Sequence, residues 1–510
     1  MAPSTRRAFL KRLGLAGASA LAVPWTAAGT PRAPSSGRAV RVEGRVVEAD
    51  GSRPLSGVPV TDGVTVTQTG ADGRYRLTST ADRPFVYLSV PAGYRLPTSD
   101  AGTARVHRPL APGAGDTVEA EFRLQPLERS DDRHAFAFLA DPQAETEAEM
   151  ETFRTTTVPD ARQTAEALGD RPVFGVGGGD LVFDTLSLFD DYKNAVRRTG
   201  LPFVQVVGNH DLDFDAPADP GSTATFRRHF GPEYYSFDRG AVHYVVLDDV
   251  YWPGSDGFGQ ENDDYLGHLD ATQLRWLEQD LALVEDGRPV VVCTHIPPLS
   301  TAYARRGEPS PSVRGMILNR EALYALLDPF DAHVVSGHVH ENEHRYEAGP
   351  HEHVVGTACG AWWTGPVCYD GTPRGYAVYE VNGESVRWRY KSTGHDATHQ
   401  MRLSFADPGA DAPDRILANV WDADAEWTVT WYEDGIRTGE MKQAPGVDPL
   451  TERLYAGEEK PDKHTWVDPQ PTDHLFTAPY NPDATRIRVE ATDRFDRTYS
   501  TAFDPPPASG

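Results

Sequence analysis

The stretch Val206-Val207-Gly208-Asn209-His210-Asp211 closes an apolar run that begins at Phe203. Such a run, followed by Gly-Asn, predicts a buried strand that ends in a turn, and a plain turn is the simplest interpretation of these residues. The stretch also brings an amide, an imidazole and a carboxylate to one strand end, where α/β folds gather their ligands. Further strands that end in such polar side chains would favour a ligand-binding site over a plain turn.

Four more apolar runs end in polar side chains of the same types. Residues 136–140 precede Asp141-Pro142-Gln143, residues 173–176 precede Gly179-Asp180, residues 289–293 precede Thr294-His295, and residues 333–336 precede Gly337-His338-Val339-His340. Turn chemistry alone does not explain five such strand ends. Helical patterns alternate with these runs, as after the capping-box sequence Asp270-Ala271-Thr272-Gln273, which indicates an α/β layer architecture.

Charge limits the classes of partner. The 510 residues, enough for about two to four domains, carry 75 acidic against 49 basic side chains and a formal net charge of -26. General affinity for a nucleic-acid duplex or an anionic membrane surface is therefore not expected. An anionic substrate would need a local positive centre, which bound metal cations would supply.

The first residues predict an exported protein. Ser4-Thr5-Arg6-Arg7-Ala8-Phe9-Leu10-Lys11 precedes an apolar run at 13–23 and small residues up to Gly29. This layout is typical of a twin-arginine signal peptide, residues 1–29, with a periplasmic or extracellular destination. The alternative, a membrane helix, needs about 20 apolar residues. We expect no transmembrane segment in the mature chain.

Two all-β modules are predicted around the α/β part. Residues 37–126 alternate in short runs separated by Asp50-Gly51 and Asp72-Gly73, which predicts a small β-sandwich. This region resembles the prealbumin-like or carboxypeptidase-regulatory-like accessory domains. We assign residues 131–393 to the α/β domain and residues 394–507 to a mainly-β C-terminal module.

The strand ends together offer oxygen and imidazole donors, a set suited to Mn, Fe, Zn, Co or Mg. Two such ions about 3.5–4 Å apart can polarise a phosphoryl oxygen. The five motifs, in their order, resemble those of the calcineurin-like metallophosphoesterases. Phe230-Gly231-Pro232-Glu233-Tyr234-Tyr235-Ser236-Phe237 and the later Trp-Trp pair are similar to three-domain bacterial members with a β module on each side. The resemblance implies a four-layer α/β/β/α sandwich.

The resemblance also implies the roles of individual residues. Asp180 would bridge two metal ions; Asp141, Gln143 and His340 would complete the first site, and Asn209, His295 and His338 the second. His210 would sit beside the substrate phosphate and Asp211 would orient its imidazole. Metal-bound hydroxide would attack, so no nucleophilic side chain is required.

One residue departs from the family pattern. Most members have Asp-x-His in the first motif, whereas this chain has Asp141-Pro142-Gln143. Gln143 would be a neutral amide ligand or no ligand, and we expect weaker binding or a different preference at the first metal. Because some family members that this chain resembles also carry Gln at this position, we interpret the change as a subtype rather than a loss of activity.

Several residues near the motifs leave alternatives open. Trp362 and Trp363 could form a stacking platform for substrate or belong to the core, and Arg374 could clamp a phosphate or form an ion pair. Cys359 and Cys368 could pair or stay free, whereas Cys293 lies in an apolar run and is expected in the core.

Further polar residues are interpreted as structural. Asp184 and Asp213 are expected to be turn or cap residues rather than ligands. His344, His351 and His353 lie in a His/Glu-rich run, for which a solvated surface loop is preferred over an extra metal site.

These observations predict an exported dinuclear phosphoesterase acting on phosphomonoesters or phosphodiesters, either small molecules or envelope-derived esters. One alternative is an envelope- or carbohydrate-binding protein that has kept the fold without turnover, and another is a phosphoprotein phosphatase. The sequence does not determine the metals, the substrate or the oligomeric state.

Overall fold

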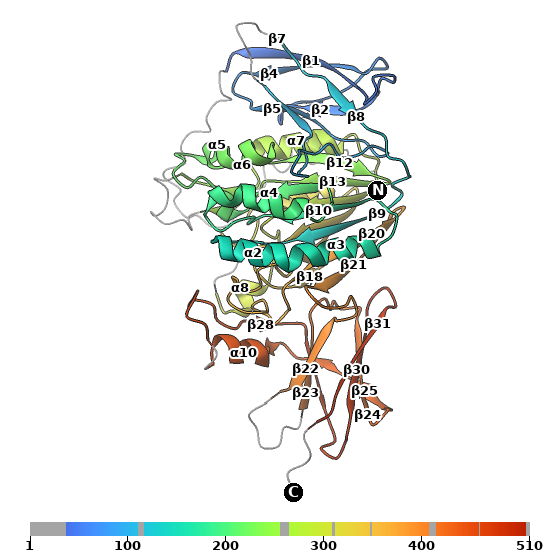
Figure 1. The fold of residues 1–510 in the computed structure, drawn as a ribbon, viewed down its shortest axis with the longest axis vertical. Coiled ribbons are helices and arrows are strands. Elements are labelled where there is room, and N and C mark those ends of the chain that lie inside the picture. The colour runs from blue at the N-terminus through green and yellow to red at the C-terminus, as the bar shows by residue number, and fades with distance from the viewer. Residues whose placement is uncertain are drawn as a thin grey trace, which may run out of the picture.

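The computed structural model describes residues 37–110, 117–254, 265–308, 312–346, 349–406, 415–457 and 460–505. Along the long axis of the molecule, an N-terminal β-rich part is followed by an α/β body and a C-terminal β-rich part (Figure 1). The predicted signal peptide, residues 1–29, lies outside the described residues. Within the described ranges, no helix is long and apolar enough to cross a membrane. The domain boundaries at 126/131 and 393/394 stay predictions.

The N-terminal part contains two four-stranded sheets, as its alternating sequence predicts. One sheet is formed by β1 (Ala39–Glu48), β4 (Arg74–Thr80), β7 (Thr117–Glu119) and β8 (Phe122–Leu124), and the other by β2 (Pro59–Thr61), β3 (Val66–Gln68), β5 (Phe85–Leu88) and β6 (His107–Pro109). This part joins the central body through backbone and side-chain hydrogen bonds, such as the one that Ser236 Oγ donates to Ser89 Oγ over 3.0 Å.

Two sheets stack face to face in the central body. The first has the order β11 (Phe203–Val206), β10 (Val173–Gly178), β9 (Arg133–Leu139), β20 (Gly375–Asn382), β21 (Ser385–Ser392); the second has the order β12 (Tyr235–Arg239), β13 (Val242–Val246), β16 (Pro289–Cys293), β17 (Asp331–Ser336), β19 (His351–Val354), β18 (Glu343–Arg345). Strands β9, β10 and β11 are parallel, as are β13, β16, β17 and β19. In each parallel set the carboxyl ends therefore meet at one edge.

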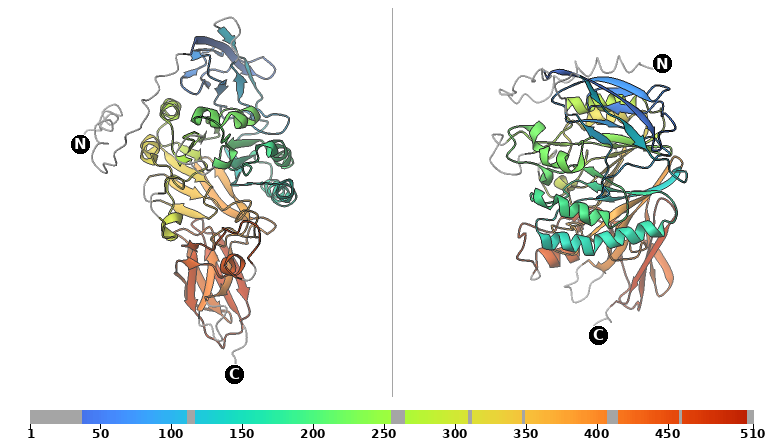
Figure 2. Two further views of the ribbon diagram at one scale, coloured as in Figure 1. Left: turned by 90° about the vertical axis from the view of Figure 1, so that its left-hand side faces the viewer. Right: turned by 45° about the horizontal axis from the view of Figure 1, so that its top comes forward.

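Helices cover the outer faces of both sheets (Figure 2). The first sheet packs against α2 (Glu147–Thr155), α3 (Thr157–Ala167) and α4 (Phe189–Arg197), and the second against α7 (Ala271–Leu281) and α9 (Arg320–Leu327). Alternation along β9 shows the layering: Phe136 and Phe138 lie in the core between the sheets, whereas Leu139 packs against helices. The result is the expected four-layer α/β/β/α arrangement.

Shorter elements complete the central body. They are η1 (Leu186–Leu188), η2 (Asn209–Asp211), α5 (Asp219–Ser222), α6 (Ala224–Phe230), α8 (Ala302–Arg305) and the pair β14 (Val250–Tyr251) and β15 (Leu266–Gly267). Asp270 caps α7 by accepting from the amides of Thr272 and Gln273. The Gln273 side chain accepts from Asp248 N instead of returning to the cap, so the expected capping box is an N-cap alone.

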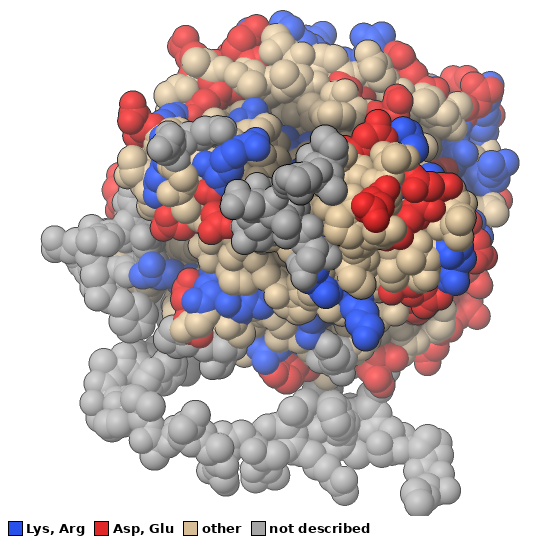
Figure 3. All heavy atoms as spheres, turned by 90° about the horizontal axis from the view of Figure 1, so that it is seen from below, with Lys and Arg blue, Asp and Glu red and all other residues tan. Residues whose placement is uncertain are grey.

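The C-terminal part is mainly β, as predicted. One sheet contains β22 (Met401–Phe405), β23 (Arg415–Val420), β29 (Leu475–Pro479) and β26 (Lys442–Gln443), the other β25 (Ile436–Glu440), β24 (Thr428–Glu433), β30 (Ile487–Thr492) and β31 (Thr498–Phe503), with β27 (Gly446–Val447), β28 (Pro471–Thr472) and α10 (Pro449–Tyr455) beside them. Acidic and basic side chains are interspersed on the face seen from the C-terminal end (Figure 3).

Candidate metal centre

The polar strand ends gather at the carboxyl edge of the two central sheets. Residues of the first motif follow β9, Asp180 follows β10, and Asn209 follows β11; from the second sheet, His295 follows β16 and the two histidines of the last motif follow β17. All seven residues predicted to bind metal come together here, and all but the half-buried His338 are buried: Asp141, Gln143, Asp180, Asn209, His295, His338 and His340.

The backbone is strained at this edge. Eleven described non-glycine residues have positive φ, and eight of them belong to the motif ends or lie next to them: Asp141, Gln143, Asp180, Asp184, His338, His340, Trp362 and Trp363. Such conformations cost about 1–3 kcal/mol each and persist where the surrounding structure enforces them, often at functional sites. The turns therefore hold the polar side chains inward at an energetic cost.

Two motif glycines allow the close approach. A Cβ on Gly208 would collide with the backbone and carboxylate of Asp180, and a Cβ on Gly337 would collide with the carboxylate of Asp141. The glycines that open Gly-Asn-His-Asp and Gly-His-Val-His are thus required by packing against the two carboxylates.

Asp180 contacts residues of both predicted metal sets. His295 Nε2 lies 3.3 Å from Asp180 Oδ1 and 3.0 Å from Asn209 Oδ1, and His338 Nδ1 lies 3.2 Å from His295 Nε2. On the other side, Gln143 Nε2 lies 3.1 Å from Asp180 Oδ2. Ligand atoms of Asp180, His295 and His338 all lie within 4.8 Å of one another.

Backbone carbonyls fix the orientation of two histidines. Nδ1 of His295 lies 3.0 Å from Gly178 O, and Nδ1 of His340 lies 2.8 Å from Gly360 O. A carbonyl only accepts, so both Nδ1 atoms carry the proton and both Nε2 atoms face carboxylates. His338 Nε2 is buried and has no hydrogen-bond partner in the described structure. The Nε2 lone pairs of these histidines are therefore suited to bind divalent cations.

The pKa shifts at the centre also fit a site for bound cations. Burial raises the pKa of Asp141 to about 8 against the opposing charge of His295. Burial lowers the pKa of His295, but Asp180 outweighs it and the pKa rises to about 10. Burial would raise the pKa of Asp180, yet His295 and then His210 hold it below its usual range. Protons here compensate buried charge, a role that bound cations would take over.

His210 is oriented by a different carboxylate from the one predicted. Its Nδ1 lies 2.7 Å from Asp184 Oδ1. Asp211 instead accepts from the amides of Leu181, Val182 and Gly208, over 2.9–3.2 Å. The assignment of Asp211 as the orienting residue is therefore wrong, because its side chain turns back to hold the loop that carries Asp180.

Asp184 was predicted to be a turn or cap residue, and no feature of its sequence context singled it out as a partner of His210. The similar prediction for Asp213 is confirmed, because Asp213 accepts from the amide and hydroxyl of Thr225 over 2.7 and 2.5 Å. Only the folded loop distinguishes these two aspartates.

Gln143 bonds to both sides of the centre. Its Nε2 donates to Asp180 Oδ2, and its Oε1 lies 3.6 Å from the thiol of Cys359. An amide flip would turn Oε1 toward the Asp180 carboxylate. Two oxygens facing each other are stable only with a cation between them, so Gln143 can support Asp180 or serve as a neutral ligand.

A cavity of about 590 Å³ opens over the centre. Six aromatic residues contribute to its lining: Phe183, Tyr265, Tyr303, Trp362, Tyr369 and Trp466. Arg306 and Arg314 are its basic residues, and His210 lines it as well. The Arg306 guanidinium is paired with Glu341 and lies 5.3 Å from the ring centre of Tyr369. Trp466 comes from the segment between α10 and β28, so the C-terminal part contributes to the cavity wall.

Two of the three predicted substrate contacts are corrected. Trp362 lines the cavity, its ring centre 5.1 Å from that of His340. Trp363 donates Nε1–H to Pro142 O over 2.9 Å and packs against the Arg374 guanidinium, 4.8 Å from its ring centre. Neither Trp363 nor Arg374 is among the cavity-lining residues, because they stack on each other behind the first motif.

The three cysteines are free, buried thiols. Cys293 lies in the core between the sheets, as predicted. Cys359 and Cys368 do not pair: the thiol of Cys359 faces Gln143 and His340, whereas Cys368 Sγ accepts from Thr357 N over 3.4 Å.

Family models match nearly the whole described chain. Residues 135–342 match the calcineurin-like phosphoesterase family, residues 40–127 match its N-terminal model ("N terminal of Calcineurin-like phosphoesterase"), and residues 352–499 match its C-terminal model ("C terminal of Calcineurin-like phosphoesterase"). The C-terminal match begins on β19, so it includes strands that the structure places in the central sheets.

Curated relatives are phosphatases. The serine/threonine-protein phosphatase CPPED1 of Homo sapiens is 27% identical over 251 residues, which cover 46% of this chain and 71% of that protein. The Danio rerio protein of the same name is 33% identical over 147 residues, 27% of this chain and 44% of its own.

Among solved structures, purple acid phosphatase PPD1 from yellow lupin has a TM-score of 0.35 at 15% identity and covers 64% of this chain and 56% of its own. The matches along the chain, together with the convergent strand ends, identify the protein: it belongs to the calcineurin-like phosphoesterases and is a metallophosphoesterase, a phosphoric ester hydrolase with N- and C-terminal modules of that family.

Proposed function

We propose that the protein hydrolyses phosphomonoesters or phosphodiesters at a two-metal centre. The position of Asp180 between the two ligand sets carries this proposal. Asp141, Gln143, Asp180 and His340 would hold one divalent ion, and Asp180, Asn209, His295 and His338 would hold the other. Such a pair, drawn from Mn, Fe, Zn, Co or Mg, supplies Lewis acidity toward a phosphoryl oxygen.

His210 provides proton chemistry beside that centre. Its Nδ1–H is engaged by Asp184, so Nε2 is the atom available to the cavity. From there it can protonate the leaving oxygen or stabilise the charge that develops on the phosphate. Asp184 holds the ring in one orientation, and Asp211 holds the backbone of the loop next to Asp180.

The cavity favours a small organic phosphate ester. Its volume of about 590 Å³ is in the range of small-molecule sites. The six aromatic residues of its described lining offer faces on which a planar or apolar leaving group can stack, and Arg314 and the Glu341-paired Arg306 are the basic side chains of that lining. With the twin-arginine segment at residues 1–29, we propose an exported enzyme acting on extracellular or envelope-derived esters.

A phosphoprotein phosphatase is the second candidate, favoured by the names of the curated relatives. Phosphate release from a panel of phosphopeptides tests it. A kcat/KM for phosphopeptides above that for small esters would make the phosphoprotein phosphatase the preferred function. The third candidate is a protein that binds envelope polymers and has no turnover. Absence of hydrolysis in both the small-ester and the phosphopeptide assays would support it.

The direct test is hydrolysis of bis-p-nitrophenyl phosphate and p-nitrophenyl phosphate with added Mn²⁺. We expect turnover of at least one ester, and the Trp466→Ala variant should raise KM several-fold with little change in kcat, because a stacked ring contributes about 1 kcal/mol. Ile436→Ala is the control, since Ile436 is an exposed apolar residue on β25 outside the cavity lining. No turnover of either ester with Mn²⁺ would contradict the proposal.

A further inference from the structure

A second group of histidines lies between the two central sheets. His333 is on β17, His351 and His353 are on β19, and His344 is on β18. His333 pairs in register with His351, and His344 with His353. Because side chains alternate along a strand, all four lie on one face of the second sheet, the face that packs on Trp388 of the first sheet.

This placement corrects the sequence interpretation of a solvated loop. His353 is 1% exposed, and His344 and His351 are half-buried on regular strands rather than in a loop. The pattern His-Glu-His is typical of a polar surface, but on a strand it places both histidines on the same face. Glu352, between them, points to the opposite face and bonds Tyr324. The histidines therefore occupy a face that stacked sheets normally fill with apolar side chains.

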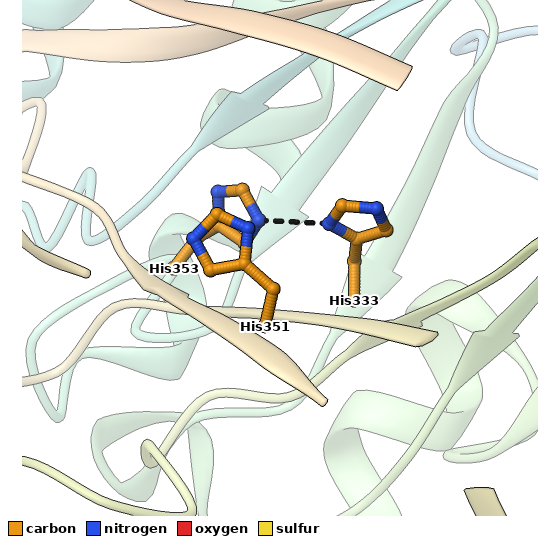
Figure 4. A group of neighbouring side chains, drawn as sticks. All are labelled: His333, His351 and His353. Carbon is orange, nitrogen blue, oxygen red and sulfur yellow. Dashed lines mark hydrogen bonds between the residues drawn. The ribbon is translucent and has the colours of Figure 1, made fainter. Parts of the chain in front are cut away.

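The ring nitrogens are close enough to share a ligand. His333 Nδ1 lies 3.0 Å from His353 Nε2 (Figure 4). One ligand nitrogen of each of His333, His351 and His353 lies within 4.8 Å of the other two. Around a tetrahedral ion with metal–nitrogen bonds of about 2.0–2.1 Å, ligand nitrogens lie about 3.3 Å apart. The 3.0 Å between His333 Nδ1 and His353 Nε2 is close to this spacing.

Without a ligand, the cluster is poorly satisfied. The Nδ1 atom of His353 is buried and has no hydrogen-bond partner in the described structure. Such an orphaned buried nitrogen is costly. Burial lowers the pKa of His333 to about 4 and lowers those of His351 and His353 far below the usual range. The rings are therefore neutral, which is the form that binds metals.

A nearby fourth ring and two carboxylates would support a bound cation. His344 Nδ1 lies 3.2 Å from His351 Nε2, and His344 Nε2 lies 3.0 Å from Asp422 Oδ1. Asp422 belongs to the C-terminal part, as does Asp424, whose Oδ2 lies 3.0 Å from Arg494 Nε. Arg494, whose charge contributes to the low pKa values of the three histidines, is thus paired with a carboxylate, and Asp422 places a carboxylate beside His344.

We propose that His333, His351 and His353 bind a third divalent metal ion of the kind that prefers imidazole, such as Zn²⁺. No carboxylate is among the three ligands, which distinguishes this site from the catalytic centre. His333 lies within β17, whereas His338 of the catalytic centre lies beyond the end of that strand at Ser336. The ion is structural: it ties β17 to β19 at the seam where the C-terminal part, through Asp422, meets the second sheet.

Elemental analysis of the full chain after equilibration with Zn²⁺ tests the site. His351→Gln and His353→Gln should each hold one ion fewer per chain than the wild type, and should lose the rise of Tm that Zn²⁺ produces through this site. Their hydrolysis of phosphate esters should be unchanged, which also shows that they are folded. His399→Gln, at a half-buried histidine outside the cluster, should match the wild type. Equal Zn²⁺ content in all four proteins would overturn the proposal.

Anomalous diffraction from crystals grown with Zn²⁺ locates the ion directly, even where a variant fails to fold. We expect a peak bounded by the three imidazoles, with ligand distances near 2.1 Å. Peaks at the catalytic centre with none between the sheets would overturn the site without affecting the proposed function. Because the probe is the metal alone, loss of hydrolysis does not influence this result.

Discussion

Two buried histidines of the second sheet, His295 at the catalytic edge and His333 between the sheets, have pKa values shifted in opposite directions. At the catalytic edge, His295 lies beside Asp180, and its pKa rises to about 10. Between the sheets, His333 has His353 as its hydrogen-bond partner, and burial lowers its pKa to about 4. Burial alone neutralises an imidazole, and a neighbouring carboxylate reverses the direction. The rule acts residue by residue, because burial lowers the pKa of His340 at the same edge to about 3.

The backbone conformation also differs between the catalytic edge and the inter-sheet histidine cluster. The ligands at the edge lie on turns, where Asp141, Asp180 and His338 have positive φ. The inter-sheet histidines lie on regular strands in unbroken register. The edge is therefore a strained site that aims mixed oxygen and nitrogen ligands into a cavity, whereas the inter-sheet cluster is an unstrained set of nitrogens in the core. Each of the following predictions tests one side of this contrast.

The largest effect is expected from Asp180→Asn. Removing the carboxylate that contacts both ligand sets should reduce kcat for bis-p-nitrophenyl phosphate by about 1000-fold or more and release metal from the centre, since several kcal/mol of charge stabilisation is lost. His353→Gln should keep its rate. A rate for Asp180→Asn above a tenth of the wild type would contradict the bridging role.

His243, on β13 of the same sheet, extends the rule to a histidine outside both groups. It lies 2.9 Å from Asp238 Oδ1 and 3.0 Å from Asp280 Oδ2. Burial lowers its pKa, but Asp280 and Asp238 outweigh burial and raise it to about 9. Because the folded-state pKa exceeds the unfolded value of about 6.5, the contribution to stability is full below pH 6.5 and is lost as pH rises through 9.

The free-energy difference between wild type and His243→Gln should therefore shrink by up to about 3 kcal/mol between pH 6 and pH 10. Urea unfolding at both pH values measures it. His134→Gln is the matched control: burial lowers the pKa of His134 to about 4, so no loss of this sign is expected. A pH-independent difference for His243→Gln would show that its carboxylate neighbours do not charge it.

The variants Asp184→Asn and Asp211→Asn distinguish a residue that orients the His210 ring from one that stabilises the loop carrying Asp180. Asp184→Asn should reduce kcat by about 10–100-fold, the usual cost of losing a carboxylate behind a functional histidine, and should alter the pH–rate profile with little effect on stability. Asp211→Asn should instead lower the free energy of unfolding by about 1–3 kcal/mol, because buried amides lose an acceptor. The reverse pattern would restore the sequence-based assignment of Asp211.

The smallest effect is expected from Gln143→His. An imidazole here should bind the first metal about tenfold more tightly, with kcat changed less than tenfold. Metal titration of the chelator-treated protein measures the affinity, and Gln205→His, a buried glutamine on β11 that bonds Tyr192, controls for the general effect of burying a histidine. Unchanged affinity would show that residue 143 is not a ligand.

The fold and the ligand set could be predicted because each depends on local patterns. Apolar runs give strands, parallel strands share an edge, and a polar residue after a run must lie at that edge. Asp141, Asp180 and Asn209 followed from this geometry alone. The three-part layout likewise followed from the change between period-two alternation and longer helical patterns.

The remaining assignments depend on tertiary placement. Asp184 and Asp211 both flank strand ends, and only the loop path decides which one reaches His210. Arg374 was a candidate substrate contact because arginine binds phosphate, but its side chain stacks on Trp363 instead. The cavity residues Arg306 and Trp466 come from segments far apart in the chain. The face shared by His351 and His353 was detectable from their spacing once the segment is taken as a strand.

The most direct test of the account is metal-dependent turnover. The wild-type protein should be stripped with a chelator, dialysed, and titrated with Mn²⁺ while hydrolysis of bis-p-nitrophenyl phosphate and p-nitrophenyl phosphate is followed. We expect no turnover in the stripped protein and full recovery as two ions per chain bind at the centre. Full activity in the stripped protein, with metal content near zero, would contradict a metal centre built from these strand ends.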